Sequence, residues 1–529
     1  MKKLITILFT LLLFHFMSFG QLGIDWQQSY GSMGSDYGYD IAESDGGYLV
    51  MGVAEASGGQ VMCFEQSSNG GGWLLKIDYS GNLLWQKCFD YVFADRIVKA
   101  INEPYYYLIG MARLDPYPEA SNLWVAKIDS LGNVIWERIL GNNDGVSSYA
   151  LFGQATTDGG IVATVNIYSS GGDITNWYGG YDGWIVKLDS LGDKEWDFSV
   201  GTSQSEFINS IIQTSDGGYL AGLYGKPNGI GGNVDCEVFN ATGGPDAIIY
   251  KIDADGNPEW HHCYGGSGHE GAGSLVETTN GYVVAAFGGS NDGDLEGSNW
   301  HGDMDVWLFN IDFSGNIIWQ KCFGGSNHEY PIRIFRSSDG GFVVFADTQS
   351  TDGDVVGNSS INPDYPSIWI FKVNGSGELL WQQSIGSNAR EQVHGVVKHS
   401  DYKYTVAGEM LYSPLGDVNC SNFVPGSQQN YWVFGVSDTT VNMAETSALA
   451  VDVKVYPNPA KSVLNIDFPA NYDMLNSTIE VINVNGKTSM QSTPVSHATQ
   501  LDIKSLVPGL YIVKIQNNDA LITRRVIIQ

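Results

Sequence analysis

The sequence predicts an all-β protein: a seven-bladed β-propeller with four-stranded blades, followed by a small Ig-like β-sandwich. One observation is a tryptophan that recurs at steps of 51 to 64 residues. Its seven positions are Trp26, Trp85, Trp136, Trp196, Trp260, Trp319 and Trp381. A second is that the intervals carry turn signals for two hairpins, and a third is that Trp and Cys disappear after residue 451. Repeats of this length with four strands each are typical of propeller blades.

The first 20 residues are predicted to be a signal peptide. Lys2 and Lys3 form a short basic start, and an apolar run over residues 4–19 follows. Ser18 and Gly20 are the small residues that a signal peptidase reads, which places cleavage before Gln21. The run is too short for a membrane span, and no later stretch is apolar enough to cross a bilayer. We therefore expect export through the periplasm without membrane insertion.

The repeat predicts two hairpins per unit. One copy, residues 73–85, has the pattern apolar-Lys-apolar-Asp, a Gly-Asn turn, two apolar residues and Trp. Another hairpin follows each recurring tryptophan, with turns such as Ser-Asp-Gly-Gly at residues 215–218 between alternating segments. The unit is therefore four antiparallel strands, A to D, with the recurring tryptophan on strand D.

The two ends of the repeat region complete one blade. Residues 432–436 are a strand C with no strand D after it, and residues 23–26 are a strand D with no strand before it. Their pairing would complete the seventh blade and close the ring with the N-terminal strand, so that no sheet edge stays unpaired. The propeller is expected over residues 21–438 and a linker over residues 439–450.

The composition is strongly acidic. Asp and Glu total 58 against 27 Lys and Arg, a formal net charge of −31 at pH 7. Loss of the two signal-peptide lysines would leave 25 basic residues and a charge of −33. Such a surface repels nucleic acids and anionic lipids, and we exclude both as partners. It is compatible with neutral glycans and divalent cations, so calcium is the one cofactor left open.

An acidic residue stands ten positions after six of the seven recurring tryptophans. The series is Asp36, Asp95, Glu206, Glu270, Glu329 and Glu391, and Val146 interrupts it. Strand A lies nearest the axis of a propeller, so these carboxylates are expected to ring the mouth of the central channel. In one interpretation each caps backbone N–H groups of a neighbouring blade. In the other they hold a cation, because converging carboxylates repel one another unless neutralised.

The six cysteines fall into two sets. Cys88, Cys263 and Cys322 stand three residues after a recurring tryptophan, whereas Cys63, Cys236 and Cys420 lie in loops between strands B and C. Strands B and D run in the same direction, so their ends reach the same face of the ring. We predict disulfides Cys63–Cys88 and Cys236–Cys263, which an oxidising compartment favours, and free thiols at Cys322 and Cys420.

Two tryptophans fall outside the repeat. Trp177 and Trp300 each lie seven residues before a strand-C position, in polar, glycine-rich B–C loops on the face of the carboxylates. They either pack against their own loops or, with Tyr178, form stacking platforms for sugar rings, with Asp292 and Asp294 accepting hydrogen bonds from hydroxyl groups. Blades 3 and 5 are not adjacent, so the second interpretation requires an extended ligand.

Residues 451–529 carry different motifs. They comprise Tyr456, Pro457, Asn458 and Pro459, then Gly486 and Lys487, then Gly509 and Tyr511. In these residues the segment resembles the type A sorting domain of the Bacteroidetes type IX secretion system. The resemblance implies a β-sandwich read by the outer-membrane translocon and usually removed by a sortase-like peptidase, with the protein outside the cell or on the outer-membrane surface. Alternating segments at residues 479–484 and 511–515 independently predict sandwich strands. An adhesive Ig-like domain is the alternative.

No hydrolase, metalloprotease or nucleotide-binding motif occurs in a suitable context. The strand-D Gly-x-x-x-Trp resembles the tryptophan-docking repeat of quinoprotein dehydrogenases, but the vicinal cysteine pair of those enzymes is absent. We expect a monomeric, non-catalytic binding protein for a glycan or a surface protein. The alternative is a polysaccharide-active enzyme, a glycoside hydrolase or lyase with axial carboxylates, although no single pair stands out as such chemistry requires.

Overall fold

The structure is a computed structural model with two compact units, Met1–Val436 and Ser437–Gln529. The predicted signal peptide and the predicted linker lie outside the described residues. The structure describes residues 22–64, 70–113, 121–142, 146, 151–226, 229–236, 244–358, 364–411, 416–420, 429–438, 453–457, 459–468, 477–483, 488–494, 496–507, 509–516 and 521–528.

The first unit consists of seven four-stranded antiparallel sheets, and six of them are each built from consecutive strands. The first three are β2 (Asp36–Ser44), β3 (Gly47–Ala54), β4 (Gly71–Asp78) and β5 (Leu83–Asp90); β6 (Val92–Lys99), β7 (Tyr105–Arg113), β8 (Ser121–Asp129) and β9 (Val134–Leu140); β10 (Phe152–Ala155), β11 (Ile161–Ile167), β12 (Asp182–Leu188) and β13 (Lys194–Val200). The next three are β14 (Glu206–Gln213), β15 (Tyr219–Gly225), β16 (Asp246–Ile252) and β17 (Pro258–Tyr264); β18 (Glu270–Thr278), β19 (Gly281–Gly288), β20 (Asp305–Ile311) and β21 (Ile317–Phe323); β22 (Glu329–Arg336), β23 (Phe342–Thr348), β24 (Ser367–Val373) and β25 (Leu379–Ile385).

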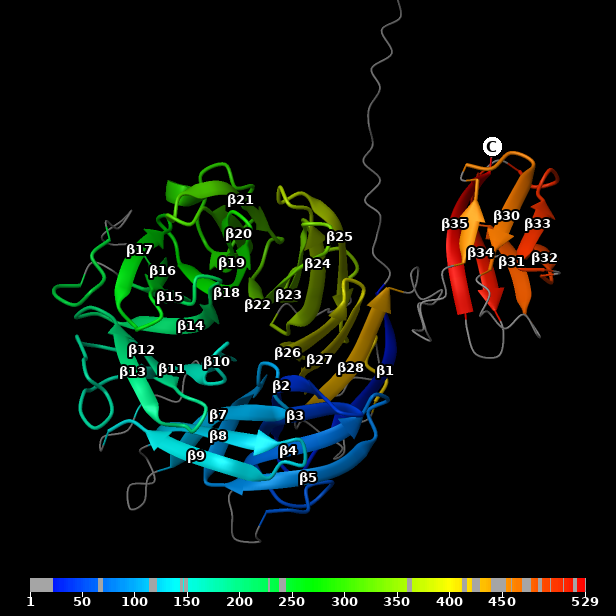
Figure 1. The fold of residues 1–529 in the computed structure, drawn as a ribbon. Coiled ribbons are helices and arrows are strands. Elements are labelled where there is room, and N and C mark those ends of the chain that lie inside the picture. The colour runs from blue at the N-terminus through cyan, green and yellow to red at the C-terminus, as the bar shows by residue number, and fades with distance from the viewer. Residues whose placement is uncertain are drawn as a thin grey trace, which may run out of the picture. The chain divides into compact units, whose positions relative to one another are not determined.

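The seventh sheet joins the two ends of this unit. Its strands are β26 (Glu391–Ser400), β27 (Lys403–Met410), β28 (Asn430–Asp438) and, beside β28, the N-terminal strand β1 (Leu22–Tyr30). The inner strand of each sheet contacts the next sheet, and β2 contacts β26 and β27. The sheets are arranged like blades around a central axis (Figure 1). The predicted propeller with seven four-stranded sheets is confirmed.

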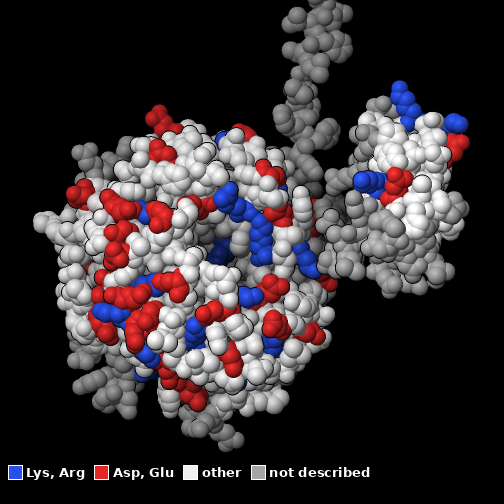
Figure 2. Space-filling model, viewed as in Figure 1, with Lys and Arg blue, Asp and Glu red and all other residues white. Residues whose placement is uncertain are grey.

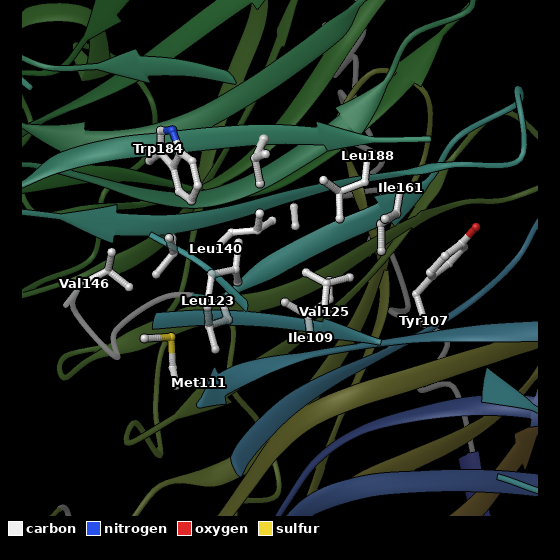
Figure 3. Packing of buried hydrophobic residues seen from close by; sticks show 14 of the residues in the cluster. Tyr107, Ile109, Met111, Leu123, Val125, Leu140, Val146, Ile161, Trp184 and Leu188 are labelled. Atoms are coloured by element: carbon white, nitrogen blue, oxygen red, sulfur yellow. The ribbon is translucent and has the colours of Figure 1, made fainter. Parts of the chain in front are cut away.

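The tryptophans of strands C are buried in the hydrophobic cores of the propeller. The strand-C indoles are fully buried, and each donates its N–H to the residue that follows a strand-D tryptophan. Trp184, for example, donates to Asp197 Oδ2 at 3.0 Å. It belongs to a core cluster in which β8 residues such as Leu123 meet β11 residues such as Ile161 (Figure 3). The cores therefore lie between neighbouring blades.

The strand-D tryptophans pack against the following blade. Trp136 in β9 donates its indole N–H to the Ser190 carbonyl at 3.0 Å, in the turn before β13. The ring covers Gly192, whose φ is +85°, and an added Cβ there would lie 2.8 Å from the indole. Glycine is therefore required twice over, by backbone conformation and by the approach of the ring. The same turn glycine recurs beside Trp26, Trp85, Trp196 and Trp319.

The second unit is built from two antiparallel sheets. One has the order β29 (Lys454–Tyr456), β30 (Val463–Asp467), β33 (Ala498–Asp502), and the other β32 (Thr488–Ser492), β31 (Thr478–Asn483), β34 (Gly509–Gln516), β35 (Leu521–Ile528). Leu464 and Leu501 from the first share a core with Val481 and Val513 from the second. An Ig-like connectivity remains a prediction.

Helical structure is minimal. Within the described ranges the one helical segment is the short 3₁₀ turn η1 (Gly293–Leu295). No helix among those residues is long and apolar enough to span a membrane.

Candidate functional site

Five of the six predicted carboxylates are the first residues of strands A and are fully buried. They are Asp36, Glu206, Glu270, Glu329 and Glu391. Each accepts a hydrogen bond from the backbone N–H four residues earlier. Glu206, for example, accepts from the Thr202 N–H at 2.6 Å and the Thr202 hydroxyl at 2.8 Å. These carboxylates therefore fix the connections that enter strand A from the preceding blade, and they do not face open solvent at the channel mouth.

Asp95 does not belong to this series. Only Tyr91 separates β5 from β6, so β6 begins early and Val92 takes the position that acids occupy elsewhere. Asp95 is instead the bulged residue between Ala94 and Arg96, and it is half-buried. Counting ten residues from the tryptophan fails here because the connection between these blades is shorter than the others.

Burial dominates the electrostatics of these acids. It raises the pKa of Glu206 to about 7 against the opposing hydrogen bonds from Thr202. Burial also raises to about 7 the pKa of Asp182, at the start of strand C, and repulsion by Glu206 contributes. The pKa of Asp246 is likewise raised to about 7, by burial and by repulsion from Glu270. Protons thus neutralise much of the repulsion between paired carboxylates near pH 7.

The structure gives no direct support for a metal centre. Within its described part, no group of three or more His, Cys, Asp or Glu side chains is arranged to hold a metal ion. The calcium ion remains a prediction, and calcium titration by calorimetry on the exported protein tests it.

Asp292 and Asp294 hold loops together. Asp292 accepts from the Ser267 N–H at 2.7 Å, and Asp294 accepts from the Gly265 N–H at 3.0 Å. The second contact is one of a repeated set, in which a B–C loop residue binds the glycine that follows strand D of the preceding blade. Asp173, Asn233 and Asp417 make the same contact. Both aspartates thus have structural partners, and their role toward a ligand remains a prediction.

The loop aromatics differ in exposure. Trp177 is 40% exposed, and its indole N–H donates to Gly180 O at 3.2 Å within its own loop. Tyr178 is half-buried, and its backbone N–H donates to Asp182. Trp300 packs against the core cluster that contains Leu295. Of these rings, Trp177 is the best placed for stacking on a ligand.

The cysteines pair as the topology suggests. Cys63 is bonded to Cys88 and Cys236 to Cys263. Cys322 is buried and Cys420 partly buried, both as free thiols.

The sorting motifs are partly described. Tyr456 is exposed at the end of β29 and donates its hydroxyl to Asp467 at 2.8 Å, whereas Tyr511 is buried in β34. Pro457, Pro459 and Gly509 are described, and Asn458, Gly486 and Lys487 lie outside the described residues.

The axis of the propeller carries residues that the sequence did not single out. A β-bulge recurs in the first strand of six blades. The residues that follow it are Asp40, Arg96, Ser210, Ser274, Arg333 and Gly395, and Phe152 takes the corresponding register in β10. All but Gly395 line an axial cavity of about 210 Å³. Basic side chains are visible in the central hollow, with acidic ones around it (Figure 2).

The two arginines also border a second cavity. It measures about 230 Å³ and is walled by Phe152, Phe287 and Tyr330, among others. Arg96 is held by the carbonyls of Leu151 at 3.0 Å and Tyr39 at 3.1 Å. Arg333 stands 14 residues after Trp319, the offset shared by Asp40, Ser210, Ser274 and Gly395 from their own tryptophans, so an alignment of the repeats could have revealed it. Arg96 stands only 11 residues after Trp85, because the connection before β6 is short.

Comparison with known families identifies the end of the chain. Residues 454–529 match the family described as secretion system C-terminal sorting domain. No curated protein matches the chain.

Several solved structures are similar to this chain at low identity and low TM-score. The β-propeller domain of the Trilobed protease from Pyrococcus furiosus is 9% identical, with a TM-score of 0.41, over 76% of this chain and 95% of that one. The quinohemoprotein alcohol dehydrogenase ADHIIG from Pseudomonas putida HK5 is 12% identical, with a TM-score of 0.38, over 84% of this chain and 80% of that one. Sqt1 from Chaetomium thermophilum is 12% identical, with a TM-score of 0.39, over 74% of this chain and 84% of that one. The family match adds that the chain ends in a type IX sorting domain, which directs it to the cell surface or the extracellular space.

Proposed function

We propose that this protein is an exported, non-catalytic binding protein whose propeller presents its axial face and B–C loops to a glycan. The ring is closed by β1, and the Ig-like C-terminal domain serves export. The observation that carries the proposal is the state of the acidic residues. A polysaccharide hydrolase needs two carboxyl groups that reach the scissile bond at a defined separation. Five of the six candidate carboxylates have no exposed surface and already accept backbone hydrogen bonds.

A glycan array tests the binding role. The exported protein, labelled with a fluorophore, is expected to bind a subset of the array in a saturable manner. The Trp177→Ala variant shows where the glycan binds. If the loop aromatics form the platform, this variant should bind more weakly, and if the glycan binds at the axis, its affinity should be unchanged. Failure to bind any glycan on the array would contradict the proposal.

Truncation tests the export role. A chain that ends at residue 450 lacks the whole matched region, 454–529. We expect it to accumulate folded in the periplasm, while the full chain reaches the surface or the medium. Equal surface delivery of both chains would contradict this role.

A further inference from the structure

Arg96 and Arg333 differ from the residues that take the corresponding position in the other blades. Among the six post-bulge positions and the matching position in β10, four carry uncharged residues, Ser210, Ser274, Gly395 and Phe152. The other three carry Arg96, Arg333 and Asp40. Two cations therefore share one carboxylate at this level of the channel. In a chain of net charge −31, two arginines thus meet at one level of the axis, and Asp95, in the bulge before Arg96, is the other nearby carboxylate.

Arg333 is the less satisfied of the two cations. A guanidinium has five N–H donors. Within the described part of the chain its ionic partner is Asp40, whose Oδ1 lies 4.0 Å from Arg333 Nη2, beyond hydrogen-bond distance. Asp40 cannot readily close this gap, because its Oδ2 accepts the Ile97 N–H at 3.2 Å. Arg333 is 24% exposed in the channel, so its donors are accessible to a ligand.

Arg96 is rigidly placed beside it. Three backbone carbonyls, of Leu151, Tyr39 and Asp95, accept from its guanidinium, and the group lies 4.7 Å from the centroid of the Phe152 ring. Such a cation loses little conformational freedom when an anion binds. The two arginines border both axial cavities, so an anionic group between them would meet both positive charges. Arginine favours carboxylates because its planar fork matches their two oxygens.

The cavities limit the size of the ligand. Their volumes, about 230 and 210 Å³, are smaller than the roughly 300–1,000 Å³ of drug-sized sites. A single sugar residue is a suitable occupant. Phe287 and Tyr330 supply aromatic surface on which the apolar face of a sugar ring can stack.

The acidic surface does not prevent such binding. At physiological ionic strength charges are screened beyond about 8 Å, so a ligand in the channel responds mainly to the groups that line it. Asp40 and Asp95 compete with a ligand for the arginines, and burial raises the pKa of both carboxyl groups.

We propose that the axis of the propeller binds a carboxylated sugar, a uronic acid residue, through Arg333 and Arg96. This inference rests on the proposed function and specifies its ligand. The experiment is calorimetric titration of the exported protein with sodium glucuronate and sodium galacturonate at constant ionic strength. Glucose and galactose are matched neutral controls, because they keep the ring and lack the carboxylate.

Both uronates are expected to bind in a saturable manner, at least tenfold more tightly than the neutral sugars. Arg333→Gln should weaken uronate binding at least tenfold, and Arg333→Lys, which keeps the charge without the fork, should weaken it less. Arg138→Gln removes an arginine from the outer strand β9 and should leave binding unchanged. If Arg333→Gln does not fold, the Arg333→Lys variant decides: unaltered uronate binding overturns the proposal.

Two results separate this inference from the proposed function. Neutral glycans retained on the array without uronate binding would overturn the axial site and leave the binding function in place. Uronate binding accompanied by cleavage of a polysaccharide would overturn the non-catalytic function and leave the axial site in place.

Discussion

Replacing Glu206 by Gln should make the propeller more stable at alkaline pH. Glu206 is fully buried at the start of β14, and burial raises its pKa from 4.5 to about 7. The folded state therefore keeps a proton that the unfolded state releases above about pH 4.5. Stability is lost as the pH rises through this window and levels off above pH 7. Gln imitates the protonated side chain and still offers a carbonyl oxygen to the Thr202 N–H.

The magnitude follows from the pKa difference. A shift of about 2.5 units corresponds to roughly 3 kcal/mol over the whole window, and about 2.5 kcal/mol of this falls between pH 5 and pH 8. We expect the stability of Glu206→Gln, relative to the natural protein, to rise by about 2 kcal/mol between these pH values. Repulsion by Glu206 also contributes to the raised pKa of Asp182, so the variant should lower that pKa.

The assay is urea unfolding followed by tryptophan fluorescence at pH 5 and pH 8. Asp255→Asn is the control, since it removes the same charge from an exposed turn. Its stability relative to the natural protein should not depend on pH in this range. A Glu206→Gln variant whose relative stability is the same at both pH values would refute the assignment of the pH dependence to this buried carboxyl group.

Four further substitutions test the packing. Cys63→Ser removes the disulfide to Cys88, 25 positions away, and should lower the free energy of unfolding by about 3 kcal/mol. An unchanged urea midpoint would contradict this expectation. Trp184→Phe removes a fully buried N–H donor and part of an inter-blade core, so a loss of about 2 kcal/mol is expected in the same assay; a loss below 0.5 kcal/mol would argue against the inter-blade role. Trp177→Ala should change stability by less than about 0.5 kcal/mol, because this residue is 40% exposed and packs against none of the core clusters of the described residues. Trp300→Ala should cost about 2 kcal/mol because its ring packs on the core, and equal costs would show that these environments are misassigned.

The architecture was predictable because its determinants are local and repeated. Each tryptophan, turn glycine and Asp-Gly pair recurs in several blades, so an error in one copy is corrected by the others. The disulfide partners followed from strand direction, which places the ends of strands B and D on the same face. The pairing of β1 with the seventh sheet could be predicted because no strand D follows the strand C at residue 432 in the sequence.

The site was harder to predict because small shifts in register decide which side chains reach the axis. Asp95 was placed by its distance from Trp85, but the one-residue connection before β6 moved it into a bulge. Arg96 escaped notice because the same short connection displaces it from the offset that the matching residues of other blades share. Arg333 keeps that offset, but it follows a β-bulge, where strand alternation no longer predicts which side chain faces the channel. The partners of Asp294 come from the preceding blade, and a pattern within one repeat does not reveal them.

The most direct test of the account is an analysis of reaction products. The exported protein is incubated with the polysaccharides that it retains on the array, and the soluble fraction is examined by mass spectrometry for released oligosaccharides and for unsaturated lyase products. Because five of the six acidic residues of the repeat are buried and hydrogen-bonded, we predict retention of the polysaccharide with no product. Time-dependent release of oligosaccharides, abolished by Glu206→Gln or by Glu270→Gln, would contradict it.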